Sequence, residues 1–197
     1  MKMNMIIAGI FCLSIAAACD TDRRTAQNEG YQDTTATDQE TVAIGEGGRI
    51  DSDTREFVNE AASGGMMEVE LGKLAQEKAT NQQVKDFGGM MVKDHGQAND
   101  RLKSIAQNKN IQLPTAMNEE HQEHVNRLRN LSGQEFDREY VNLMVEDHEE
   151  DISKFESMQG DVQDQELKQW IDSTLPTLRT HKERIDQIKN TIDNKRS

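Results

Sequence analysis

The strongest constraint on the fold is a nearly continuous helical spacing of apolar residues through most of the chain after Ile50. Apolar residues recur every three or four positions, a spacing that places them on one face of an α-helix. The chain has only two prolines, and aromatic residues make up 4% of it. Because β-sheets favour aromatic and β-branched residues, this sequence predicts an all-α protein.

Turn-forming residues divide this region into five helical segments. Pro114, Gly133 and Gly160 mark three of the breaks between them. Pro176 lies inside the last segment, where it should kink or divide the helix because proline lacks a backbone donor. Two long hairpins joined by a short helix predict an antiparallel four-helix bundle. The predicted helices span residues 54–80, 81–108, 115–131, 134–158 and 162–194.

The first part of the chain has the features of an export signal. Lys2 precedes an apolar run, residues 5–15, that is too short to span a bilayer, and small residues lead to Cys19. Residues 1–19 resemble a bacterial lipoprotein signal, in which Cys19 becomes the lipidated N-terminus after cleavage. The alternative is an ordinary secretory signal that is cleaved near Ala18. Both interpretations predict that the protein leaves the cytoplasm.

The segment after the signal contains almost nothing apolar to bury. Residues 20–52 are rich in Thr, Asp, Gln and Gly, which predicts a flexible tether to a bundle domain at 53–195. A lipid on Cys19 would attach this domain to a membrane of the cell envelope, either the outer membrane or the periplasmic face of the inner membrane. Loss of Cys12 with the signal would leave the folded domain without a thiol.

The overall charge excludes one class of function, and the residue pattern gives no support to another. A net charge of -13 leaves no basic stripe to neutralise phosphates, so we do not expect a nucleic-acid-binding protein. No serine or cysteine stands in the arrangement of an activated nucleophile, so the sequence does not indicate a hydrolase.

A short motif, Met-Val-x-Asp-His, occurs twice, at Met91–His95 and at Met144–His148. On a helical projection both histidines share the apolar face of their helices, as His181 does in the last helix. The first long helix has no histidine, but Glu68 interrupts its apolar face. Each long helix therefore turns one candidate ligand toward the centre of the bundle.

Three neutral imidazoles and one carboxylate are suitable ligands for a single transition-metal ion such as Zn, Fe, Mn or Cu. Spacing from the nearest aromatic residue predicts a similar depth for Glu68 and His148, whereas His95 and His181 differ by about one turn. The alternative is that the histidines are buried structural residues, with ring nitrogens bonded to carbonyl or carboxylate groups.

Several neighbours of these ligands are candidates for an accessory role. Asp94 and Asp147 point about 100° away from the core, so we expect them to support neighbouring groups and not to be ligands themselves. Asp151 lies one turn beyond His148 on the same face. Met91 and Met144 have the spacing of core residues, with thioether ligation of Cu(I) as the alternative.

Longer stretches resemble a known family. The segment FVNEAASGGMMEVELGKLAQEKATNQQVKDFGGMMVKDHGQANDRL (57–102), with LSGQEFDREYVNLMVEDH and LPTLRTH later, resembles the bacterial ferritin-like family called domain of unknown function 4142. The resemblance runs from about residue 54 to about residue 188. It implies a ferritin-like bundle in an exported or outer-membrane protein and implies no particular activity.

Ferritin-like di-iron proteins use Glu-x-x-His motifs, and none ends at His95, His148 or His181. A carboxylate-bridged di-iron centre is therefore not expected.

Two hypotheses follow. The first is a lipid-anchored envelope protein that binds one metal ion for buffering or stress protection. The second is a non-catalytic interaction module with structural histidines, whose protein partner the sequence does not identify.

Overall fold

The computed structural model describes residues 50–194, and all of its regular structure is helical. The export signal, Cys19 and nearly all of the tether expected at 20–52 lie outside the described residues. Within the described residues no strand is present. The helices are α1 (Ser52–Lys78), α2 (Gln82–Asn108), α3 (Glu119–Arg129), α4 (Gly133–Asp161) and α5 (Gln165–Asn194).

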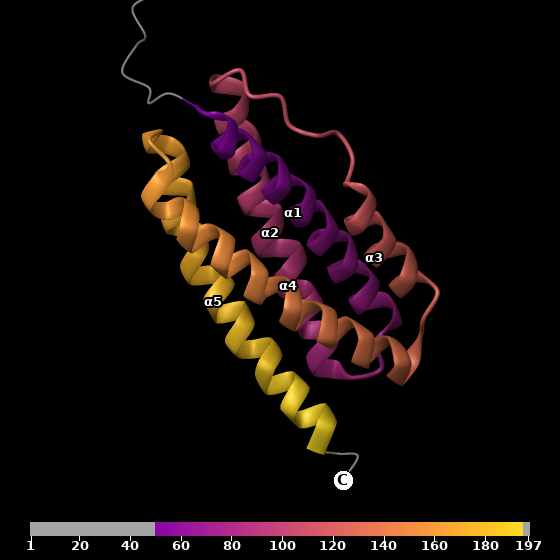
Figure 1. The fold of residues 1–197 in the computed structure, drawn as a ribbon. Coiled ribbons are helices and arrows are strands. Elements are labelled where there is room, and N and C mark those ends of the chain that lie inside the picture. The colour runs from indigo at the N-terminus through magenta and orange to yellow at the C-terminus, as the bar shows by residue number, and fades with distance from the viewer. Residues whose placement is uncertain (1–49, 195–197) are drawn as a thin grey trace, which may run out of the picture. The chain divides into compact units, whose positions relative to one another are not determined.

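The four long helices form two antiparallel hairpins, α1 with α2 and α4 with α5, and α3 connects them along one side of α1 (Figure 1). Phe57 at the start of α1 packs against Phe155 near the end of α4 and Trp170 near the start of α5. Phe87 at the start of α2 packs against Tyr140 at the start of α4. These contacts make α2 and α4 parallel, so the connection through α3 crosses from one end of the bundle to the other.

Capping side chains, and not the apolar spacing alone, set where two of the helices begin. α3 begins at Glu119, later than expected, because the Asn118 side chain accepts a hydrogen bond from the His121 amide at 2.8 Å. α5 begins after Asp164, which accepts from the Leu167 amide at 3.1 Å. Pro176 was expected to kink or divide the last helix, and it does not divide it, since α5 continues through it.

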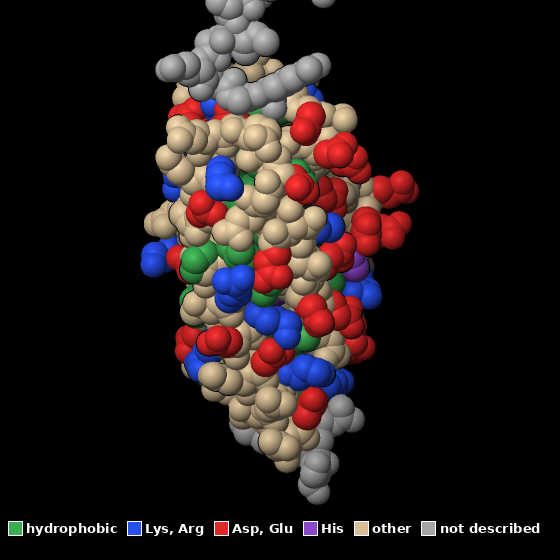
Figure 2. Space-filling view, turned by 60° about the vertical axis from the view of Figure 1, so that its left-hand side comes forward, with side chains coloured by type: hydrophobic (Ala, Val, Ile, Leu, Met, Phe, Trp, Pro, Cys, Tyr) green, Lys and Arg blue, Asp and Glu red, His purple; other side chains and the backbone are tan. Residues whose placement is uncertain are grey.

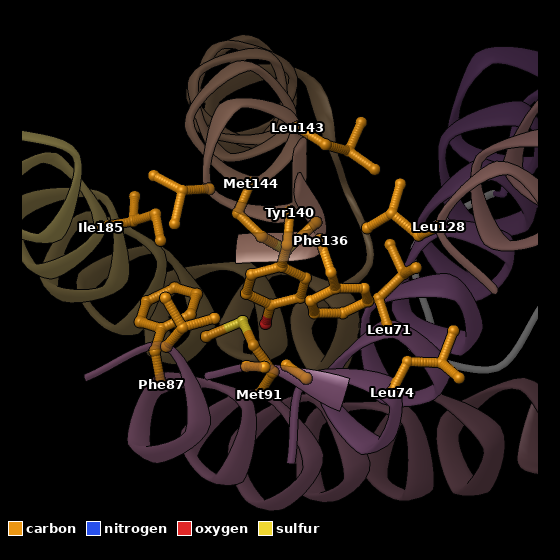
Figure 3. Packing of buried hydrophobic residues seen from close by; sticks show 14 of the residues in the cluster. Leu71, Leu74, Phe87, Met91, Leu128, Phe136, Tyr140, Leu143, Met144 and Ile185 are labelled. Atoms are coloured by element: carbon orange, nitrogen blue, oxygen red, sulfur yellow. The ribbon is translucent and has the colours of Figure 1, made fainter. Parts of the chain in front are cut away.

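The apolar core consists of two clusters with a polar layer between them. One cluster lies toward the turn between α1 and α2, and Figure 3 shows Tyr140 and Phe136 side by side in it, near Phe87 and Met91. The Phe136 and Tyr140 rings stack with centroids 5.7 Å apart. The other cluster lies at the opposite end around Phe57, Phe155 and Trp170. The layer that separates them holds Glu68, His95, His148 and His181.

Two glycines bring α1 and α2 into backbone contact close to this polar layer. A Cβ atom on Gly72 would lie 2.7 Å from the Gly88 carbonyl oxygen, and one on Gly88 would lie 2.6 Å from the Gly72 carbonyl oxygen. Larger residues would push the two helices apart. Since Glu68 lies one turn before Gly72 and His95 two turns after Gly88, this close packing places the two candidate ligands side by side.

None of the helices in residues 50–194 combines the length and the hydrophobicity that crossing a bilayer requires.

Candidate metal centre

Glu68, His95, His148 and His181 meet in the middle of the bundle, one from each long helix, as their positions on the apolar faces predict. Glu68, His148 and His181 are at most 1% exposed, and His95 is 5% exposed. The ring centroid of His95 lies 5.6 Å from that of His148 and 5.2 Å from that of His181, and the ring centroids of His148 and His181 are 5.5 Å apart. The one-turn mismatch expected for His181 does not separate it from the others.

A chain of hydrogen bonds links three of these residues to Asp94. Glu68 Oε2 lies 2.5 Å from His95 Nδ1, His95 Nε2 lies 3.3 Å from His181 Nδ1, and His181 Nε2 lies 3.1 Å from Asp94 Oδ2. Because the Asp94 carboxylate accepts, His181 donates from Nε2 and keeps a lone pair on Nδ1. His95 must then donate from Nε2 to His181, so its Nδ1 accepts a proton shared with Glu68.

His148 is oriented by the backbone of its own helix. Its Nδ1 donates to the Met144 carbonyl oxygen at 3.0 Å, which leaves the lone pair on Nε2. This Nε2 atom faces Glu68 Oε1 at 3.7 Å. A ring nitrogen fixed in this way by a carbonyl is the usual arrangement of a metal-binding histidine.

Four buried polar atoms around this point have no hydrogen-bond partner within the described residues: Glu68 Oε1, Asp147 Oδ2, His148 Nε2 and the Tyr140 hydroxyl. Buried polar groups are nearly always paired, because an unpaired one costs about 1–3 kcal/mol. Three of the four atoms are electron-pair donors that repel one another. A bound cation would satisfy them together.

Burial keeps the three histidines neutral. It lowers the pKa of His95 and of His181 to about 4. It also lowers the pKa of His148 well below its ordinary value, and the neighbouring His95 and His181 add to this effect. All three imidazoles are therefore uncharged at neutral pH, which is the form that binds metals.

Burial has the opposite effect on the acids. It raises the pKa of Glu68 well above its ordinary value, and the nearby Asp151 raises it further. Burial, followed by the charge of Glu68, also raises the pKa of Asp147. Without a cation, the charged forms of these two neighbouring carboxyl groups are therefore disfavoured. A metal ion that enters this centre would displace protons.

The accessory residues divide into two groups. Asp94 bonds to His181, and Asp151 lies close enough to His95 to affect the pKa of His95. Burial raises the pKa of Asp151 to about 6. Met91 and Met144 are fully buried in the apolar cluster of Figure 3, as their spacing predicts for core residues. Met144 also contacts the centre through its backbone carbonyl, which accepts the hydrogen bond from His148.

Asp147 lies differently from its predicted position. Helical projection turns it away from the core, but Glu68, Asp147 and His148 each offer a ligand atom, and these atoms lie within 4.8 Å of one another. His95, His148 and His181 form a second such group. The two groups share His148, so the centre offers either three nitrogens or one nitrogen and two carboxylates. Asp147 therefore belongs to the centre as a candidate ligand.

Tyr140 is a residue of the centre that the sequence analysis missed. Its hydroxyl is buried without a partner, and its pKa is raised by burial and by the nearby Glu68 and Asp147. Tyr140 stands seven positions before Asp147, two helical turns away on the same face. That spacing did not identify it, because the projection turned Asp147 and its face of the helix away from the core.

The other two histidines of the described region do not join the centre. His121 Nδ1 lies 2.7 Å from Ser63 Oγ, and His121 Nε2 lies 3.6 Å from Glu60 Oε1. Since the Asn118 amide donates to the same Ser63 oxygen at 2.8 Å, this network attaches α3 to α1. His124 lies beside Arg127 near the surface.

The fold and the centre together define an all-helical bundle with a buried cluster of histidines and acids. Comparison with protein families gives the identity: the family described as Domain of unknown function (DUF4142) matches residues 39–188, and the chain belongs to it. No curated protein sequence matches the chain significantly.

One solved structure is similar in fold, that of CopM in the Cu(II)-bound form. The TM-score is 0.60 at 14% sequence identity, and the similarity covers 70% of this chain and 95% of the CopM chain. At this identity the likeness concerns the helical bundle alone.

Proposed function

We propose that this protein binds one transition-metal ion between its four long helices, through His95, His148, His181 and Glu68. The observation that supports this most strongly is the set of unpaired buried atoms at one point of the bundle. A purely structural polar layer would be expected to pair these atoms with one another or with the backbone.

The chemistry of the ligands favours an ion that accepts imidazole nitrogen. Neutral imidazoles suit Zn, Cu, Fe and Ni, and a carboxylate adds an anionic oxygen that compensates part of the charge. CopM, whose fold is similar, has been described in a Cu(II)-bound form. Copper is therefore the first ion to test in this protein, followed by Zn, Fe and Mn.

We further propose that the bundle is ferritin-like and works in the cell envelope, anchored through a lipid on Cys19. The arrangement that supports the first part is the single crossover connection between two antiparallel hairpins, which ferritin-like bundles share. Support for the second part is the signal-like sequence that ends at Cys19. A metal-binding domain on such an anchor would buffer metal or protect the envelope from metal stress.

The test is elemental mass spectrometry on protein purified without a metal-affinity tag. We expect close to one equivalent of metal in the wild type and almost none in His95→Ala/His148→Ala. Glu68→Gln is a second variant that preserves side-chain volume. His124→Ala, which removes a histidine outside the centre, is the matched control and should keep its metal.

Circular dichroism would establish that each variant is folded. The proposed function would be excluded if the wild-type protein contained no metal and its melting temperature did not change on addition of Cu, Zn, Fe or Mn. The histidines would then be structural, and the protein would be an interaction module of the envelope.

A further inference from the structure

An acidic cavity of about 200 Å³ lies between α1, α3 and α4, beside the candidate metal centre. Its only lysine or arginine among the described residues is Lys154, which pairs with Glu150 at 2.8 Å and with Glu60 at 3.7 Å, and His121 and His124 line it as well. Figure 2 shows acidic side chains gathered along one side of the molecule, with a histidine among them. The acidic residues that line the cavity are Glu60, Glu120, Glu146, Asp147, Glu150 and Asp151.

The cavity reaches the metal centre through Asp147. Asp147 lines the cavity, and it also belongs to the group of ligand atoms formed with Glu68 and His148. Its Oδ2 atom is buried and has no hydrogen-bond partner. The acidic cavity thus reaches a residue that has an unpaired carboxylate oxygen and that offers a ligand atom within 4.8 Å of those of Glu68 and His148.

A second cavity approaches the centre from the opposite side of the bundle, between α2 and α5. It has a volume of about 310 Å³, and His95 and Asp94 line it. Arg101 lines it as well and donates a hydrogen bond to Ser173 at 2.9 Å. One positive charge therefore balances the one acid in this cavity, whereas the cavity under α3 has a large excess of negative charge.

We propose that divalent metal cations reach the buried centre through the acidic cavity under α3, and that Asp147 transfers them to Glu68 and His148. This inference rests on the proposed function of the centre. Clefts with one sign of charge and low-dielectric walls concentrate ions of the opposite sign and accelerate their association. The acids around the cavity would act on the rate of metal binding more than on the final affinity.

The test measures the rate at which Cu²⁺ binds to the metal-free, full-length protein. Trp170 is the only tryptophan of the chain, and quenching of its fluorescence by Cu²⁺ in a stopped-flow instrument reports binding. The cavity variant is Glu120→Gln/Glu146→Gln/Glu150→Gln, three exposed acids that line the cavity. The matched control is Glu77→Gln/Asp100→Gln/Glu183→Gln, which removes the same charge from exposed positions elsewhere.

We expect the association rate to fall about tenfold in the cavity variant and less than twofold in the control, with the difference shrinking as salt is added. In a further variant, Arg101→Gln, the rate should stay within about twofold of the wild type. If ions entered between α2 and α5 instead, the Arg101→Gln variant would bind Cu²⁺ faster than the wild type, because a positive charge on that route would be lost.

Equal rates in the cavity variant and the control would overturn the acidic route, and so would faster binding in Arg101→Gln. In both cases an equilibrium titration with one Cu²⁺ per chain would leave the proposed function intact. A titration in which Cu²⁺ does not bind to the wild type would overturn the proposed function and the route with it.

Discussion

Two buried acids on the facing sides of α1 and α4 have opposite surroundings. Asp137, near the end of the bundle, accepts hydrogen bonds from the Thr80 amide at 3.0 Å, the Thr80 hydroxyl at 2.5 Å and the Asn81 amide at 3.0 Å. Glu68, in the middle, has one oxygen bonded to His95 and the other unpaired. This difference in hydrogen bonding shows that Asp137 stabilises a turn, whereas Glu68 has an oxygen available to a ligand.

The physical reason is the source of the donors. Asp137 faces the turn between α1 and α2, where backbone amides are free to donate. Glu68 faces the middle turns of the neighbouring helices, where the backbone amides already donate to carbonyl groups of their own helix. Only side chains can therefore donate to Glu68. An acid in that position requires a proton or a cation.

The largest effect is expected from Asp137→Ala, which leaves two amides and a hydroxyl without an acceptor. We expect the free energy of unfolding to fall by about 3 kcal/mol, because hydrogen bonds to a charged group each contribute about 1.5–3 kcal/mol. Denaturant unfolding in chelator and in metal would measure it. The loss should be the same in both conditions, and a loss that depends on metal would break the comparison.

Metal should stabilise the wild type by a similar amount. A free metal concentration of roughly 100 times Kd adds about 2.7 kcal/mol to the free energy of unfolding, provided that the unfolded chain does not bind the ion. The melting temperature should rise with metal and return with chelator. Asp137→Ala should keep this shift and His95→Ala/His148→Ala should lose it; a shift retained in the double variant would place the metal elsewhere.

Asp151→Asn tests the cost of a half-buried acid beside the centre in metal-free protein. Burial raises the pKa of Asp151 from 3.8 to about 6, so its contribution to stability is complete below pH 3.8 and is lost as the pH rises through 6. Relative to the wild type, the variant should therefore gain about 1 kcal/mol between pH 5 and pH 8.

Unfolding by denaturant at both pH values would measure this gain. Glu183→Gln, which removes one acid from the exposed surface of α5, is the control and should show no such trend. A relative stability of Asp151→Asn that does not change with pH would mean that its carboxyl is well solvated.

Glu68→Gln should have the smallest effect on stability and the clearest effect on binding. The amide can donate to His95 Nδ1 as the protonated acid does, so we expect metal-free stability within about 1 kcal/mol of the wild type. Metal stabilisation should disappear, since the anionic oxygen is lost. Unfolding with and without metal measures both quantities, and a strongly destabilised metal-free variant would indicate that Glu68 is structural, like Asp137.

The sequence predicts much of this arrangement because one face of each long helix is apolar. The faces that contain Glu68, His95, His148 and His181 had to turn inward, so their convergence follows from helical spacing. Asp147 and Tyr140 were harder to predict. Their positions at the centre depend on which elements cover the side of α4 that carries them, and a projection of α4 alone treats that side as exposed to solvent.

The sequence by itself therefore determined the all-helical class, the long helices and the inward side of each, since these follow from local spacing and capping. Only the tertiary structure decided the relative depth of the helices and the role of their flanks. Close contact at Gly72 and Gly88 brings Glu68 beside His95, and the packing of α3 on α1 forms the acidic cavity that ends at Asp147. Both results arise from contacts between residues far apart in the chain, which local periodicity does not contain.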